Sequence, residues 1–177
     1  MTRYLALLRG INVGGRQKLK MADLRALLSS LGYTDVATLL QSGNAVFTAA
    51  DGSPETLAVD IQDRITTELG LTVTVMVRTE DDLRRVIGQI PFEVRDPSKC
   101  AVAFLSSPVD RARIEVLDHA SFAPEELVAG ERELYLYFPD GMGRSKLLPI
   151  LSRDTFDPAT VRNWNTTTKL LDLAEER

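Results

Sequence analysis

The stretch VATLLQSGNAVFT, residues 36–48, decides the fold. Residues 36–41 and 45–48 are rich in apolar and β-branched side chains, which favour strands. Ser42-Gly43-Asn44 between them suits a tight turn, because Gly and Asn tolerate positive φ. The stretch therefore predicts a β-hairpin, and its flanking segments determine what kind of sheet the hairpin joins.

An amphipathic helix is predicted on each side of this hairpin. The first has leucines at helical spacing and ends at Gly32, and the second begins with the cap Ser53-Pro54. Short apolar or alternating runs predict a strand beyond each helix. In order, these elements cover residues 4–9, 21–31, 36–48, 53–69 and 71–77. The order β-α-β-β-α-β predicts a ferredoxin-like arrangement.

The rest of the chain repeats this order, starting from a capping box at Thr79–Asp82. The predicted elements are a helix over 79–90, a strand over 100–105, a helix over 109–119 with Val116 and Leu117 inward, a hairpin around Gly130, a helix over 145–151, an extended piece over 160–162 and a helix over 166–174. The fold class predicted is α+β. It comprises two ferredoxin-like (βαββαβ) lobes, at residues 1–78 and 79–177, the second with an extra C-terminal helix.

Composition narrows the class of protein. A chain of 177 residues with 44% hydrophobic content is typical of soluble globular proteins. The apolar runs are too short for a signal peptide or a membrane span. Cys100 is the single cysteine, so the chain has no internal disulfide. We therefore expect a cytoplasmic protein with no membrane partner.

Positive charge is concentrated in two parts of an acidic chain. The net charge is −4, yet residues 1–20 carry +5 and residues 139–169 carry +2, which leaves −11 for the rest. A local basic loop on an acidic body suits a small anionic ligand better than a long nucleic acid, which usually needs a wide basic face.

Gly10 and Gly15 have the spacing of a P-loop, but the motif is incomplete. Arg16-Gln17 stand where a P-loop requires Lys followed by Ser or Thr, and a Gly-x-Gly-x-x-Gly fingerprint is absent. What remains is a basic, glycine-rich turn whose backbone N–H groups could face an anion.

Nucleophilic and metal chemistry have weak support. Ser42 or Cys100 would need a base, and the one histidine, His119, is adequately explained by its place near a helix end. One His and one Cys are too few for a zinc site, so no metal is predicted. Asp140 is the one carboxylate in the motifs. Whether a reaction is catalysed, and with which cofactor, stays open.

The segment Pro139–Lys146 joins a predicted strand to a predicted helix. Ser145 lies where a helix cap would, and Arg144 and Lys146 beside it face an unfavourable helix dipole unless an anion offsets their charge.

A third segment, Arg162–Thr166, precedes the last helix. Asn165 or Thr166 is the expected cap of that helix, and Trp164 is expected to be a packed anchor. Arg162 and Asn163 have fewer structural roles and are better candidates for ligand contacts.

Four segments together resemble the domain of unknown function 1697 family of bacterial cytosolic proteins. They are residues 7–15, 41–44, 139–147 and 162–166. The resemblance covers nearly the whole chain and implies an α+β fold, but it implies no activity.

These observations predict a pocket for a small molecule bearing a phosphate or carboxylate. The expected ligand-binding residues are Arg9, Asn12, Gly14, Gly15, Arg16, Ser42, Asn44, Arg144, Ser145, Lys146, Arg162, Asn163 and Asn165. The alternative is a module that binds single-stranded nucleic acid on a ferredoxin-like sheet, although Tyr4 and Phe47 are the only aromatics on the first lobe's strands. A third reading is a structural role. The ligand's identity and the oligomeric state are left open.

Overall fold

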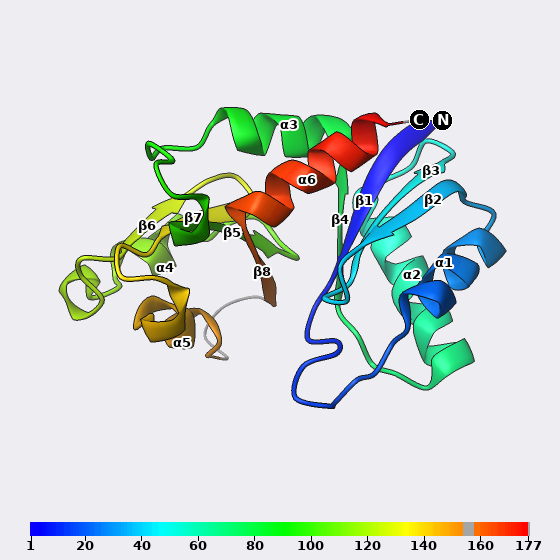
Figure 1. Ribbon diagram of the computed structural model, residues 1–177, viewed down its shortest axis with the longest axis horizontal. Helices are drawn as coiled ribbons and strands as arrows, with labels where there is room; N and C mark the ends of the chain where they lie inside the picture. Colours follow the sequence, from blue (N-terminus) through cyan, green and yellow to red (C-terminus); the bar gives the residue numbers. More distant parts are fainter. Residues whose placement is uncertain (154–157, 177) are drawn as a thin grey trace. The chain divides into compact units, whose positions relative to one another are not determined.

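The computed structural model describes residues 1–153 and 158–176, and the chain divides into two compact units. Unit 1 comprises Met1–Arg84 and Lys169–Arg177, and unit 2 comprises Arg85–Thr168 (Figure 1). The helices α3 (Glu80–Gly88) and α6 (Trp164–Glu175) contain the points of division. The division into domains at residues 1–78 and 79–177 stays a prediction.

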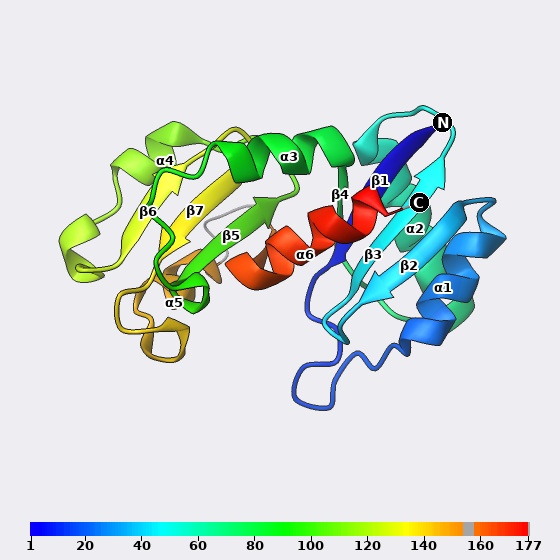
Figure 2. The same cartoon turned by 45° about the horizontal axis from the view of Figure 1, so that its top comes forward.

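Unit 1 has the predicted β-α-β-β-α-β order. Its elements are β1 (Thr2–Leu8), α1 (Met21–Ser30), β2 (Thr34–Leu39), β3 (Asn44–Ala49), α2 (Pro54–Leu69) and β4 (Val75–Thr79). The strands form an antiparallel sheet in the order β2-β3-β1-β4. This spatial order confirms the ferredoxin-like arrangement, and both crossover helices cover one face of the sheet (Figure 2).

The core of unit 1 follows from strand alternation. Tyr4, Ala6 and Leu8 point to the face that packs against α1 and α2. The ring of Tyr4 stacks on Phe47, with centroids 5.7 Å apart, and Tyr33 stacks on the same Phe47 ring at 4.6 Å. These aromatic rings therefore belong to the core.

Local signals set the ends of α2 and the start of α3. The Ser53 hydroxyl accepts from the Thr56 backbone N–H at 3.1 Å, and Gly70 ends α2 with φ of +67°. At the start of α3, Thr79 and Asp82 each accept from the other's backbone N–H at 3.0 Å, which confirms the capping box.

Unit 2 repeats the topology with shorter helices. Its elements after α3 are the 3₁₀ turn η1 (Pro97–Lys99), β5 (Cys100–Leu105), α4 (Arg111–Glu115), η2 (His119–Ser121), β6 (Glu126–Ala129), β7 (Glu133–Tyr137), η3 (Met142–Arg144), α5 (Leu147–Leu151) and β8 (Ala159–Asn163). The antiparallel order β6-β7-β5-β8 matches that of unit 1. The sheet packs one face on a core that includes Phe122, Phe138 and Leu147.

Several predicted boundaries are wrong. The strand predicted over 71–77 begins at Val75, and the helix predicted over 109–119 is reduced to α4 and η2. Val116 is 82% exposed and does not face the core, because the helix ends before it. The last helix begins at Trp164, two residues earlier than predicted.

No helix in the described part of the chain is long and apolar enough to cross a membrane.

Candidate functional site

The predicted ligand-binding residues divide between the two units. Arg9–Arg16 with Ser42 and Asn44 lie in unit 1, and Arg144–Lys146 with Arg162–Asn165 lie in unit 2. Each group is described within its own unit, and the convergence of both on one pocket stays a prediction.

The glycine-rich loop of unit 1 ends in a tight hairpin. Gly14 and Gly15 have φ of +58° and +75°, and the Arg16 N–H donates to the Val13 carbonyl at 3.0 Å. Two consecutive positive φ values are typical of a type I′ turn, where glycine is favoured. The two glycines are therefore explained by the turn itself.

The base of this loop is fastened by Asn12. Its Nδ2 donates to the carbonyls of Leu19 at 2.9 Å and Gln41 at 2.6 Å, and its Oδ1 accepts from the Leu19 N–H at 2.9 Å. The side-chain amide thus joins the loop to the turn between β2 and β3. Its role in the structure is to hold the backbone.

The turn itself packs closely under the loop. A Cβ on Gly43 would lie 2.6 Å from Ile11 Cδ1 and 2.8 Å from Leu8 Cβ, so this position requires glycine. Asn44 is fully buried in β3, and its Nδ2 donates to the Leu39 carbonyl and to the Ser42 hydroxyl. The motif at 41–44 is accounted for by the turn.

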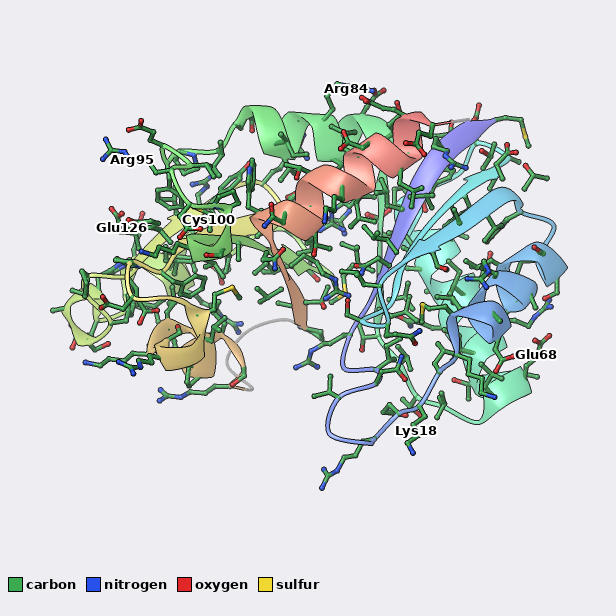
Figure 3. The ribbon with its side chains drawn as sticks, viewed as in Figure 1. Lys18, Glu68, Arg84, Arg95, Cys100 and Glu126 are labelled. Carbon is green, nitrogen blue, oxygen red and sulfur yellow. The ribbon has the colours of Figure 1, made fainter. Side chains whose placement is uncertain are left out.

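The cations of the loop remain exposed. Within residues 1–153 and 158–176, the side chains of Arg9, Arg16 and Lys18 form no hydrogen bond or ion pair. Figure 3 shows Lys18 extending from the loop away from the ribbon. The loop therefore displays positive charge on an ordered hairpin.

Unit 2 contains a cleft of about 500 Å³, which we call the α5 cleft. Lys99, Arg144 and Lys146 supply its cations, and Glu125 and Asp140 supply its carboxylates. The side chains of the three cations have no hydrogen bond or ion pair with any described residue. Two of these cations were predicted from the sequence, whereas Lys99 was not.

An internal carboxylate occupies the start of α5. Glu125 accepts from the Ser145 hydroxyl at 2.6 Å and from the Lys146 backbone N–H at 2.7 Å. Ser145 Oγ in turn accepts from the N–H groups of Leu147 and Leu148, which confirms the capping role. The backbone amides that were predicted to face a ligand thus already donate to Glu125. An external anion would therefore bind to the side chains of the three cations.

Arg162 lies elsewhere in unit 2. It is 8% exposed in β8, and its Nη1 donates to Thr160 Oγ1 at 2.6 Å and to the Val161 carbonyl at 3.1 Å. Burial lowers the pKa of its guanidinium to about 10. Arg162 does not line the α5 cleft.

The residues beside it cap and pack the last helix. Asn163 Oδ1 accepts from the Thr166 N–H at 2.8 Å, so Asn163, and not Asn165 or Thr166, is the cap of α6. Trp164 is 9% exposed, in agreement with a packed anchor, and Asn165 is exposed.

A second cleft of about 500 Å³ adjoins the first at Lys99, and we call it the Tyr137 cleft. Its walls are Pro91, Phe92, Glu93, Arg95, Asp96, Lys99, Glu126 and Tyr137. The rings of Phe92 and Tyr137 are tilted, with centroids 5.7 Å apart. The sequence motifs did not predict this cleft. Two features of the sequence pointed to it. Phe92 directly follows Pro91, which ends the predicted helix, and Tyr137 lies near the end of a predicted strand on the face opposite its leucines.

Cys100 and His119 do not form a reactive pair. Cys100 is buried in β5, and burial raises the pKa of its thiol. His119 Nε2 lies 3.0 Å from the Ile114 carbonyl near the end of α4. Among the described residues, no group of three His, Cys, Asp or Glu side chains is placed to hold a metal ion.

The chain belongs to the family described as Protein of unknown function (DUF1697), whose model matches residues 1–135. It is also similar to a solved structure, that of the conserved bacterial protein SP0830 from Streptococcus pneumoniae. The two chains are 25% identical, the TM-score is 0.79, and the match covers 98% of this chain and 99% of the other. No curated protein sequence matches this chain.

Proposed function

We propose that this member of the DUF1697 family binds a small molecule bearing a phosphate or carboxylate, in the α5 cleft of unit 2. The observation that carries the proposal is the set of three cations, Lys99, Arg144 and Lys146, on the walls of one cleft. None forms a hydrogen bond or ion pair with a described residue, although the charge of Lys99 also helps to lower the pKa of Asp96. Like charges that share a cleft repel one another, and a bound anion removes that cost.

The two carboxylates of the cleft, Glu125 and Asp140, offset only part of the charge of its three cations. Both oxygens of Glu125 accept hydrogen bonds from the start of α5, which leaves Asp140 as the one acid without such bonds. Charge-assisted hydrogen bonds from Arg and Lys are the strong interactions that small anions use in proteins. An anion in the α5 cleft would therefore meet an excess of donors.

The nucleic-acid alternative has less support. A sheet that binds RNA displays aromatic rings on which bases stack. Tyr4 and Phe47 are at most 1% exposed and stack within the core beneath α1 and α2, so they present no such surface. What favours this alternative is the set of exposed Arg and Lys side chains in residues 9–20, which suit contacts with a phosphate backbone.

Isothermal titration calorimetry with ribose 5-phosphate and citrate tests the proposal. We expect Arg144→Ala and Lys146→Ala each to weaken binding about tenfold, because each removes one charge-assisted contact. Arg113→Ala is the matched control. Arg113 is an exposed arginine of unit 2 that pairs with Asp110 and does not line the cleft. Equal affinity in all variants would refute the site. A steep salt dependence of generic RNA binding would instead favour the alternative.

A further inference from the structure

The α5 cleft and the Tyr137 cleft share one residue, Lys99. Lys99 ends η1 just before β5, and its carbonyl accepts from the Phe138 N–H at 2.8 Å. Its backbone is therefore fixed where the two clefts meet. A ligand that places an anion on one side of Lys99 can place a second group on the other.

The polar groups of the Tyr137 cleft are not equally free. Arg95 pairs with Glu93 at 3.0 Å, and Asp96 Oδ1 accepts from both the N–H and the hydroxyl of Ser98. The hydrogen bonds from Ser98 also lower the pKa of Asp96. By contrast, Lys99 and Glu126 form no hydrogen bond or ion pair with the described residues, so they are the charged groups left for a ligand.

Glu126 and Tyr137 lie on the same face of the sheet. Tyr137 is directly opposite Glu126 in β6, so their side chains project side by side. Figure 3 shows Glu126 and Arg95 at the same end of unit 2. Phe92 adds a second ring beside Tyr137, which makes an aromatic wall with a carboxylate at its edge.

This combination selects a class of ligand. Aromatic side chains bind the flat face of a nucleobase by stacking. A carboxylate accepts hydrogen bonds and donates none, so it matches a base edge that presents two adjacent N–H donors. Guanine presents such an edge at N1 and N2, whereas adenine places an acceptor beside its amino group.

We propose that the two clefts together bind one guanine nucleotide. Its base stacks on Phe92 and Tyr137 and donates to Glu126, and its phosphate contacts Lys99, Arg144 and Lys146. This inference rests on the proposed function, because the phosphate uses the anion site of the α5 cleft. The base site is an additional claim with its own residues.

Titration calorimetry with GMP, AMP, guanosine and ribose 5-phosphate tests the inference. We expect GMP to bind at least tenfold more tightly than each of the other three, because each lacks the guanine edge, the phosphate or the base. Phe92→Leu should weaken GMP binding five- to tenfold and leave ribose 5-phosphate unchanged, since leucine keeps apolar bulk but loses the ring. Glu126→Gln should abolish the preference for GMP over AMP.

Glu115→Gln is the matched control. Glu115 is an exposed glutamate of α4 that lines neither cleft, so its substitution should change no affinity by more than twofold. Circular dichroism melts of every variant establish that it is folded.

The two proposals fail in different ways. If ribose 5-phosphate binds as well as GMP and loses affinity in Arg144→Ala, the anion site stands and the nucleotide inference is overturned. If AMP binds as tightly as GMP, the role of Glu126 and with it the guanine assignment are overturned. If none of the phosphates binds at millimolar concentration, the nucleotide inference is overturned, and if citrate does not bind either, the anion site is overturned as well.

Discussion

Unit 1 and unit 2 have the same strand order but very different crossover helices. In unit 1, α1 and α2 are 10 and 16 residues long, whereas α4 and α5 in unit 2 have five residues each. The chain between strands of unit 2 is therefore mostly irregular, and residues 123–125 and 139–146 of these segments supply most of the α5 cleft, whereas residues 91–99 ahead of β5 supply most of the Tyr137 cleft. One topology thus has long crossover helices in one unit and two clefts of about 500 Å³ in the other, and loops on a rigid scaffold tend to carry function.

The largest expected effect tests whether the helices of the two units differ in their contribution to stability. Ile61 in α2 is fully buried, and Leu151 in the five-residue α5 is 7% exposed. We expect Ile61→Ala to lower the free energy of unfolding by about 4 kcal/mol and Leu151→Ala by about 2 kcal/mol. Urea unfolding followed by circular dichroism measures both. Equal losses would mean that the short helices pack as tightly as the long ones.

A second comparison concerns two glycines with nearly the same φ. Gly43 and Gly141 have φ of +89° and +86°, but a Cβ on Gly43 would clash with Leu8 and Ile11, whereas one on Gly141 would meet nothing within 4 Å. We expect Gly43→Ala to cost about 3 kcal/mol, from strain and overpacking together, and Gly141→Ala about 2 kcal/mol, from strain alone, because φ of +86° with ψ of 160° is a region that glycine almost alone adopts. Thermal melts of the two variants decide whether the turn of unit 1 is the more constrained.

Two neighbouring glutamates allow a sharper test within unit 2. Glu125 accepts from Ser145 and from the backbone of Lys146, while Glu126 has no partner among the described residues. Glu125→Ala should lower the free energy of unfolding by about 2 kcal/mol, because it leaves donors at the start of α5 unsatisfied. Glu126→Ala should change it by less than about 0.5 kcal/mol. The opposite ranking in urea unfolding would contradict the assignment of Glu125 as a structural anion.

The sequence was sufficient for the strand order, since hydrophobic periodicity, the Ser42-Gly43-Asn44 turn and the caps at Ser53 and Thr79 all act locally. It was insufficient for helix length in unit 2, where packing rather than propensity decides how far a short helix extends. The segment over 109–119 shows this, because Asp110 caps α4 and the helix still ends at Glu115.

The candidate site was predictable only where its signals are local in the sequence. Arg144 and Lys146 could be chosen from their place at a helix start, and the structure places both on the wall of one cleft. That Glu125 already satisfies the backbone there could not be predicted, because it lies about 20 residues away in the sequence. The burial of Arg162 was missed because β8 was expected to be a short extended piece.

The smallest expected effect concerns the caps of two crossover helices, the long α2 of unit 1 and the short α4 of unit 2. Ser53 caps the long helix α2 through the Thr56 N–H, and Asp110 caps the short helix α4 through the Ala112 N–H. Ser53→Ala should cost about 1 kcal/mol, because the loss propagates through a helix that covers the sheet. Asp110→Ala should cost about 0.5 kcal/mol, since α4 is one turn long and its neighbouring backbone is already irregular. Hydrogen exchange gives the local readout: protection should fall along the first turns of α2 in Ser53→Ala, whereas equal loss of protection in α4 and α2 would show that the short helix is as cooperative as the long one.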